Sequence, residues 1–535
     1  MRFPATCVPA TTSFLWAVSA FLLPAGAQSP RPSAGLTFVD PMRLATASLV
    51  DSNSRTVHTW TTSARGIASY LDRKGNVLRV VKNSFSFGGT VERLALDGTR
   101  LWKYSPPFGN QHHDIHELPN GNILMAVTHD VSKASAIALG RDPKTVPEIV
   151  SAERIIEVKP TGPTTGSIVW EWRVMDHLVQ DFDSKKPNFG PVAQHPQRID
   201  VNYPRSIGGL WQHLNGIDYN PQLDQVVLSC RNWSECWVID HSTTTTQARG
   251  TTGGKSGKGG DLLYRWGNPA AYKTAGTQQL HSQHDVNWIW PGYPGAGNLI
   301  CFNNKRGLLL KLGDASAVTE FAPPIDHNGN YSRAVGKAFG PAAPAWEYLA
   351  AKPTDFYSAV VSSAVRLVNG NTLVCSGTQD HVFELGASNK IVWQATVPMP
   401  FKARRYERTL WASDEKVSAT SGGRIDFDLM AGTAWANQVY IMLGSASGTK
   451  PGINVGPFTI PLNLDVYLLS SLQSPLLPKS IGKLDATGNA QAGFVLPASI
   501  GLPFLGLTLN HAHVLLDSGL ALRRASNAVP VTIVK

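Results

Sequence analysis

The chain has 535 residues, of which 42% are hydrophobic and 16% are charged, so it can bury a large core and does not have a disordered composition. Its 48 glycines and 36 prolines follow no three-residue period, which excludes a collagen-like chain. The net charge of +10 is scattered along the chain and not clustered with aromatic residues, which argues against nucleic-acid binding. Many Gly, Pro and Trp residues with few charges favour short strands joined by tight turns.

Residues 1–27 have the pattern of a secretory signal peptide. Arg2 gives a basic start, Phe14–Leu23 is an apolar run too short to span a bilayer, and the segment closes on the small residues Ala-Gly-Ala. We predict cleavage after Ala27 and a secreted or periplasmic mature protein with no membrane span. A buried strand or an uncleaved anchor is the alternative.

Four cysteines follow this segment, and none belongs to a CxxC pair. Cys230, Cys301 and Cys375 each end an apolar run, where a buried thiol is the simplest interpretation. In an oxidising compartment Cys230 and Cys236 could instead form a disulfide across a tight turn.

A strand–turn–strand pattern recurs five times. The first two copies are IASYLDRKGNVLRVV at 67–81 and HHDIHELPNGNILMAV at 112–127, and the others begin near residues 213, 283 and 362. The turns carry Gly, Asn or Pro, and two outer strands ending near a tryptophan follow most copies. Repeated units of two hairpins predict the blades of a β-propeller.

Residues 45–61 resemble the outer half of one more blade, which residues 404–411 could complete. We therefore expect an all-β protein with six blades over residues 28–417; five or seven blades, or a stacked β-sandwich array, are the alternatives. The repeat ends near residue 418, and the strand pattern of residues 418–535 predicts a small C-terminal β-sandwich. Two insertions, at 175–212 and 242–260, are expected to be a rim loop and a mobile segment.

Histidines open three of the five repeats, at His113, His213 and His284. Arg231 ends the second strand of the His213 repeat. Because the innermost strand begins each blade, these side chains should point into one shared channel. Imidazoles that act as nucleophile, acid or base, together with one guanidinium, suit a tetrahedral oxyanion such as sulfate or phosphate.

Each histidine taken alone is more simply structural, and Asp114 and Asp285 fit hydrogen bonds between blades better than catalysis. His112 competes with His113, because adjacent strand residues face opposite ways, and the repeated His-Asp pair favours His113. Four other histidines lack this register and are expected to be structural: His116, His129, His241 and His281.

No metal or cofactor is predicted, because His113, His213 and His284 are not arranged in an HxH or HExxH spacing; metal binding by these three histidines is the alternative. A serine hydrolase is disfavoured because the chain has no GxSxG elbow.

Four segments resemble the bacterial arylsulfate sulfotransferases (arylsulfotransferase family): HHDIHELPNGNILM, QHLNGIDYNPQLDQVVLSCRNWSECWVIDHSTTT, LLYRWGNPAAY and SQHDVNWI. The likeness covers roughly residues 45–408. It implies a six-bladed periplasmic propeller that moves a sulfuryl group from an aryl sulfate ester to a phenolic acceptor, without a nucleotide donor. The implied mechanism is ping-pong through a sulfohistidine.

The resemblance also implies the roles of individual residues. His284 in SQHD matches the sulfated nucleophile, and His113 in HHD matches the acid/base histidine. The groups that the resemblance implies to bind the sulfuryl group are His213, Asn215 and Arg231. His112, next to His113, is a further candidate for substrate binding.

Two features depart from the family. Its best-known members carry an N-terminal β-sandwich, whereas the extra domain here is expected to be C-terminal. The poor match over residues 175–212 leaves the aryl pocket unassigned. A non-catalytic ligand-binding or scaffold propeller and a metal-dependent hydrolase are the other functions to be tested.

Overall fold

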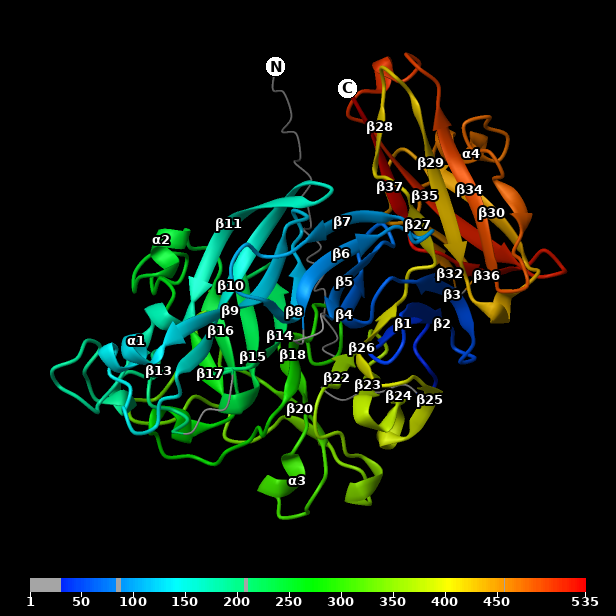
Figure 1. Ribbon diagram of the computed structural model, residues 1–535. Helices are drawn as coiled ribbons and strands as arrows, with labels where there is room; N and C mark the ends of the chain where they lie inside the picture. The colour runs from blue at the N-terminus through cyan, green and yellow to red at the C-terminus, as the bar shows by residue number, and fades with distance from the viewer. Residues whose placement is uncertain (1–29, 83–87, 206–209, 457) are drawn as a thin grey trace, which may run out of the picture.

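The computed structural model describes residues 30–82, 88–205, 210–456 and 458–535 (Figure 1). The predicted signal peptide therefore lies outside the described residues. Within the described ranges, no helix combines the length and the apolar character needed to cross a bilayer.

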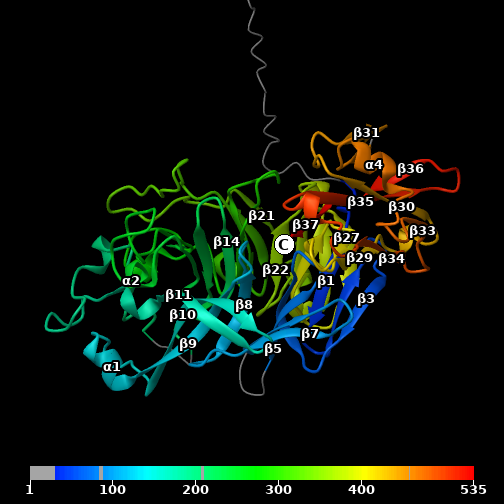
Figure 2. The ribbon, with the colours of Figure 1, turned by 90° about the horizontal axis from the view of Figure 1, so that it is seen from above.

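Six four-stranded antiparallel sheets form the body of the molecule, and their innermost strands contact one another in a closed ring around a channel (Figures 1 and 2). The strands of each sheet follow one another from the channel outward. The first blade consists of β26 (Pro400–Tyr406), β1 (Leu36–Pro41), β2 (Thr46–Val50) and β3 (Thr56–Thr61), and the second of β4 (Gly66–Leu71), β5 (Val77–Lys82), β6 (Gly89–Leu94) and β7 (Arg100–Tyr104). The third blade consists of β8 (Gln111–Glu117), β9 (Ile123–Ser132), β10 (Ile149–Gly162) and β11 (Thr165–Arg173). The fourth blade consists of β14 (Leu214–Asn220), β15 (Gln225–Cys230), β16 (Glu235–Asp240) and β17 (Tyr264–Trp266), and the fifth of β18 (His284–Trp288), β19 (Leu299–Asn303), β20 (Ala317–Phe321) and β21 (Trp346–Tyr348). The sixth blade consists of β22 (Ser363–Arg366), β23 (Thr372–Ser376), β24 (His381–Leu385) and β25 (Ile391–Thr396). This arrangement is a β-propeller and confirms the predicted all-β fold class.

The burial of the strands explains their sequence patterns. Strands in the middle of a blade, such as β15 and β19, are buried at every residue because each blade packs between two others. Their sequences are therefore continuous apolar runs and do not alternate.

The ring is closed by a strand from the C-terminal end of the repeat region. β26 pairs antiparallel with β1, with Leu36 opposite Tyr406, and so completes the sheet that begins the chain. The expected return of residues 404–411 was therefore placed too late, because β26 begins at Pro400 and Trp411 already belongs to the next unit. Strand β1 was not expected at all.

Two further sheets pack face to face at the C-terminal end of the chain. The smaller sheet is β27 (Leu410–Ala412), β29 (Gly423–Met430) and β34 (Asn489–Leu496); the larger is β28 (Lys416–Ser418), β37 (Val529–Val534), β35 (Thr508–Leu516), β30 (Val439–Ser445) and β33 (Ile481–Lys483), with β36 (Leu522–Ala525) paired to β35. Phe427 and Phe494 of one sheet share a core with Leu515 and Val531 of the other. Because β27 and β28 belong to these sheets, the C-terminal unit begins before the boundary expected at residues 417 and 418.

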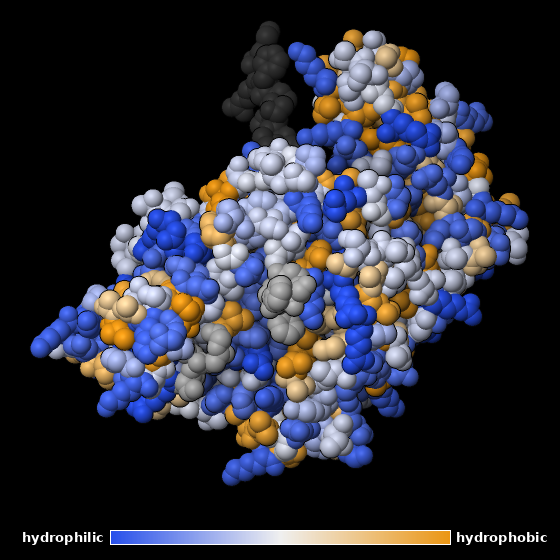
Figure 3. Space-filling model, in the orientation of Figure 1, coloured by the Kyte–Doolittle hydropathy of each residue, from blue (hydrophilic) through white to orange (hydrophobic). Residues whose placement is uncertain are grey.

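A hairpin of β31 (Ile453–Val455) and β32 (Phe458–Ile460) and the helix α4 (Val466–Ser471) decorate this unit. Several apolar side chains are exposed here, and hydrophobic residues are visible on the unit at the upper right of Figure 3. Examples are Leu464, Val466, Leu469, Phe504 and Leu520.

Within the described residues, both insertions contain short elements of secondary structure. In the first, β12 (Leu178–Val179) pairs with β13 (Ile199–Asp200), and its apolar residues join the core of the third and fourth blades. In the second, α2 (Thr245–Ala248) begins with a capping box between Thr244 and Gln247. The remaining helices, α1 (Lys133–Ala138) and α3 (Arg306–Leu309), are also short.

All four cysteines in the described ranges are free and buried, as was predicted for Cys230, Cys301 and Cys375. Cys230 and Cys236 lie on the paired strands β15 and β16 without forming a disulfide.

His241 binds the third blade to the fourth, and this contact predicts how stability depends on pH. Its ring nitrogens lie 2.9 Å from Asp224 and 3.0 Å from Glu157. Burial alone would lower the pKa of His241, but the two carboxylates raise it to about 9. The folded pKa is above the unfolded value, so this stabilisation is complete below about pH 6.5 and is lost as the pH rises through about 9.

We expect the loss to amount to about 3 kcal/mol in the free energy of unfolding. Urea unfolding of the wild type and of His241→Gln across this range would measure it. The difference between the two proteins should shrink as the pH rises. A constant difference would contradict the assignment.

Candidate active site

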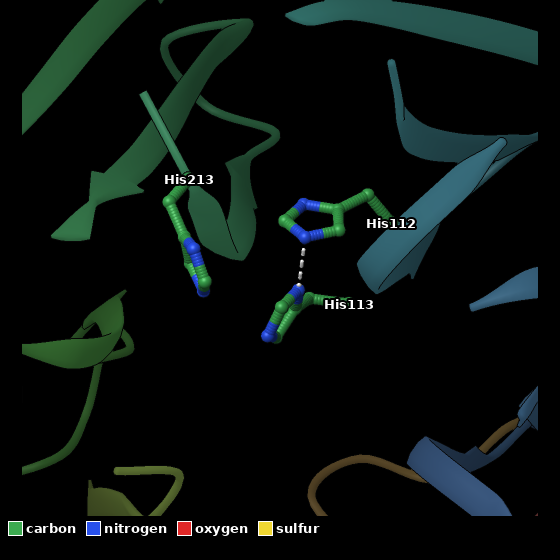
Figure 4. A group of neighbouring side chains, drawn as sticks. All are labelled: His112, His113 and His213. Carbon is green, nitrogen blue, oxygen red and sulfur yellow. Dashed lines mark hydrogen bonds between the residues drawn. The ribbon is translucent and has the colours of Figure 1, made fainter. Parts of the chain in front are cut away.

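Three of the predicted histidines meet at one end of the channel (Figure 4). The ring centroid of His113 lies 4.8 Å from that of His213, and that of His112 lies 5.2 Å from that of His213. Phe401 of β26 lies beside this group, with its ring 5.6 Å from His113 and 6.2 Å from His284. The candidate histidines of the third, fourth and fifth blades are therefore gathered in one place.

Irregular pairing at the start of the innermost strands produces this arrangement. In β8 the register shifts between Gln111 and Ile115, and His113 takes a left-handed conformation with φ of 53°. His112 and His113 consequently both reach the channel, so the expectation that they face opposite ways was wrong. β14 and β18 shift register at the same point, just after His213 and His284. Bulges commonly re-aim side chains next to functional sites.

His284 is held in a single tautomer. Its Nε2 accepts the backbone N–H of Val361 at 3.1 Å, so the proton lies on Nδ1, which donates to Oδ1 of Asn304 at 2.7 Å. Asn304 is oriented in turn, because its Nδ2 donates to the carbonyls of Ser358 and Val361. Burial lowers the pKa of His284 to about 3 despite the bond to Asn304. The imidazole is therefore neutral, with its lone pair on Nε2.

Asn304 was missed by sequence reasoning, although a signal was present. It directly follows β19, just as Arg231 directly follows β15. Aligning the repeats on the ends of their second strands would have paired the two residues.

Arg231 contributes the positive charge of the site. It begins a short 3-10 turn (Arg231–Trp233), and its guanidinium donates to Oδ1 of Asn232 at 3.1 Å. No carboxylate of the described residues lies within salt-bridge distance of it. Burial lowers its pKa, and its charge also disfavours protonation of His113, His213 and His284. A partly buried cation without a counter-ion, among neutral imidazoles, is a site for an anion.

The pKa values of His113 and His213 lie well below the usual range. The main cause is burial, and the neighbouring histidines and Arg231 add to it. Neutral imidazoles can accept or donate one proton each, which acid/base chemistry requires.

Asn215 ties two of these strands together. Its Nδ2 donates to the backbone oxygen of Gln283, directly before His284, at 2.9 Å. It therefore positions the strand of His284 relative to that of His213.

Asp114 and Asp285 have the structural role that was predicted for them. Lys402 of β26 lies 2.6 Å from each carboxylate, and Tyr70 donates to Asp114 at 2.7 Å. Arg404 adds a second contact to Asp285. This buried cluster links the innermost strands of several blades.

We expect Lys402→Met to lower the free energy of unfolding by about 3 to 5 kcal/mol, because it leaves the buried Asp114 without its cation. Lys74→Met is the matched control, since Lys74 pairs with Asp414 at the surface. The control should cost less than about 1 kcal/mol. Equal effects in chemical denaturation would contradict this role of the cluster.

A cavity of about 1590 Å³ lies at the other end of the channel. The far ends of the innermost strands line it, including His116 and Trp288, together with Asp426 and Asp428 of the C-terminal unit. None of the six candidate site residues lines this cavity. The C-terminal unit therefore borders the end of the propeller opposite the histidines.

His112, His113 and His213 could together hold a metal ion, since their ligand nitrogens lie within 4.8 Å of one another. However, His112 Nε2 and His113 Nδ1 already share a proton across 2.7 Å. The charge of Arg231 also opposes a second cation beside His113 and His213. The arrangement suits an anion better than a metal.

The fold and the site together define a β-propeller whose channel holds a partly buried guanidinium among neutral imidazoles. The chain belongs to the Arylsulfotransferase (ASST) family, whose sequence model matches residues 58–407. This confirms the resemblance seen in the sequence. Membership supports an arylsulfotransferase activity in general terms and small-molecule substrates.

Solved structures that resemble the chain are distant. They include a protein of unknown function from Bacteroides caccae (12% identity, 69% of this chain and 98% of that one, TM-score 0.38). Others are the periplasmic gluconolactonase PpgL of Pseudomonas aeruginosa (11%, 70% and 99%, 0.36) and the Cps50 (Swd1) β-propeller domain of Myceliophteria thermophila (9%, 70% and 89%, 0.34). No curated protein matches the sequence.

Proposed function

We propose that this protein is a nucleotide-independent sulfotransferase that moves a sulfuryl group from an aryl sulfate ester to a phenolic acceptor. The observation that carries this proposal is Arg231, a cation that pairs with no carboxylate of the described residues and whose charge acts on three neutral histidines. A sulfate ester supplies the missing negative charge, and an imidazole lone pair supplies the nucleophile.

In the first half-reaction His284 Nε2 attacks sulfur, and an N–S bond forms as the S–O bond to the aryl group breaks. The electron pair of that bond stays on the phenol oxygen, which takes a proton from His113. Attack requires Nε2 to release the N–H of Val361. Arg231 and His213 stabilise charge on the sulfuryl oxygens, and the bond from Asn304 keeps the His284 ring in position.

In the second half-reaction an acceptor phenol occupies the place of the first. His113 takes its proton, the phenol oxygen attacks sulfur, and the N–S bond returns its electrons to His284. The result is ping-pong kinetics with a sulfohistidine intermediate.

The test is release of p-nitrophenol from its sulfate ester by the purified mature protein. We expect slow release alone and faster release when phenol is added, with aryl sulfate formed from the acceptor. Release that is insensitive to phenol but abolished by a chelator would instead indicate a metal-dependent hydrolase. Binding of the ester without release would indicate a ligand-binding propeller.

We also propose that the protein acts outside the cytoplasm after cleavage near Ala27, as the pattern of residues 1–27 suggests. Amino-terminal sequencing of the protein from cell fractions would test this. A cytoplasmic protein that retains Met1 would refute it.

A further inference from the structure

We infer that Glu153 and His112 form a proton relay with His113 and determine which nitrogen of His113 carries its proton. The relay runs from a carboxylate in the third strand of a blade to an imidazole in the channel. The part of the relay in catalysis rests on the proposed sulfuryl transfer. The contacts and tautomers of the relay do not depend on that proposal.

The contacts in the relay are short and buried. Oε1 of Glu153 lies 2.7 Å from His112 Nδ1, and His112 Nε2 lies 2.7 Å from His113 Nδ1. Glu153 and both imidazoles are almost completely buried. The two carboxylate oxygens also accept the backbone N–H of Leu214, at 2.9 and 3.1 Å.

These contacts determine the tautomers in sequence. A carboxylate that only accepts hydrogen bonds requires a proton on His112 Nδ1. When His112 carries no second proton, its lone pair is at Nε2 and accepts the proton of His113 Nδ1. The lone pair of His113 is thereby placed on Nε2, the nitrogen directed away from the relay.

The surroundings of His284 differ in a way that fits a division of roles. Its Nδ1 proton is accepted by the neutral amide of Asn304, with no carboxylate in the chain of contacts. His113 is linked through His112 to an anion that can stabilise an added proton. The first environment suits a nucleophile that remains neutral, and the second suits an acid and base.

The relay balances the protons of both half-reactions once it holds one added proton, which the resting neutral enzyme takes from solvent as it enters the cycle. In that form His112 is an imidazolium between Glu153 and His113 Nδ1, and His113 carries its own proton on Nε2. When the donor phenolate leaves, Nε2 gives it this proton and His112 passes one to His113 Nδ1. When His113 Nε2 then takes the proton of the acceptor phenol, the Nδ1 proton returns to His112 Nε2, and the starting form is restored.

Glu153→Gln tests this role with little change in shape. The amide oxygen can still accept from Leu214, but the amide nitrogen would donate to His112 Nδ1. His112 would then carry its proton on Nε2 and donate to His113 Nδ1, which moves the proton of His113 to Nε2. We expect kcat/KM to fall about 10³- to 10⁴-fold, by comparison with a carboxylate-to-amide change in a catalytic triad.

Glu157→Gln is the matched control, because Glu157 lies on the same strand, is similarly buried and contacts His241. It should retain activity even if it lowers stability. An equal loss of activity in both variants would reduce Glu153 to a structural link between blades and overturn the relay.

Nitrogen-15 NMR of histidine-labelled protein tests the relay without any assay of activity. We expect both His112 and His113 to carry the proton on Nδ1 in the wild type at neutral pH, and on Nε2 in Glu153→Gln. A wild-type His113 protonated on Nε2 would overturn the inference even if the variant did not fold. If the wild type transfers no sulfuryl group but shows the expected tautomers, the proposed function fails and the relay stands.

Discussion

Replacing His284 with asparagine should abolish sulfuryl transfer. The side chain of asparagine has no lone pair able to form the N–S bond, so both half-reactions are lost. Loss of a nucleophile in another covalent enzyme costs on the order of 10⁶-fold in kcat, and we expect an effect of that scale. The fold should survive, because His284 is one of many buried side chains between blades and carries no charge.

His381→Asn is the control for this change. His381 is the first residue of β24, which is the third strand of its blade, and its Nε2 contacts Gln394. The measurement is p-nitrophenol release with phenol, combined with mass spectrometry of protein incubated with the ester alone. We expect the wild type and the control to gain one sulfuryl group and the His284 variant to gain none. A sulfated peptide from another histidine would show that the nucleophile has been assigned wrongly.

Removing the charge of Arg231 should have the next largest effect. Arg231→Leu should lose about 2 to 4 kcal/mol of transition-state stabilisation, which corresponds to a fall of about 30- to 10³-fold in kcat/KM. The kcat/KM of Arg231→Lys should lie between that of the wild type and that of Arg231→Leu. The lysine ammonium keeps the positive charge but cannot bind two oxygens through a planar pair of donors.

The same substitution should leave the fold intact or make it more stable. The guanidinium is partly buried without a carboxylate partner among the described residues, so its desolvation is not offset until an anion binds. Arg366 is the contrasting case, because it is buried against Glu320 and Arg366→Leu should be strongly destabilising. A lowered melting temperature in Arg231→Leu would contradict an anion-binding role for this arginine.

The sequence predicted those site residues that occupy the same place in the repeated strand–turn–strand pattern. His213 and His284 lie at the start of successive blades, and Arg231 directly follows a second strand, so each holds a position in a local pattern. Local patterns of apolar residues and turns can be read along the chain, because they depend on neighbours in sequence.

The partners of these residues could not be found in this way. Glu153 reaches His112 from β10, and Lys402 reaches Asp114 from β26, a strand placed far along the chain. Such contacts form only when the blades pack against one another, and no periodic pattern in the sequence predicts them. The bulge that turns both His112 and His113 into the channel also depends on how β8 pairs with β9.

The sequence by itself determined the β-propeller, the histidine register and the family. Only the tertiary structure decided which nitrogen of each imidazole holds a proton. That choice depends on Asn304, Val361 and Glu153, which hydrogen bonds bring to the channel from separate strands and turns. The sequence gives the histidines themselves. Their protonation, which makes each one an acid, a base or a nucleophile, is determined by hydrogen bonds shorter than 3.2 Å between segments that are far apart in the chain.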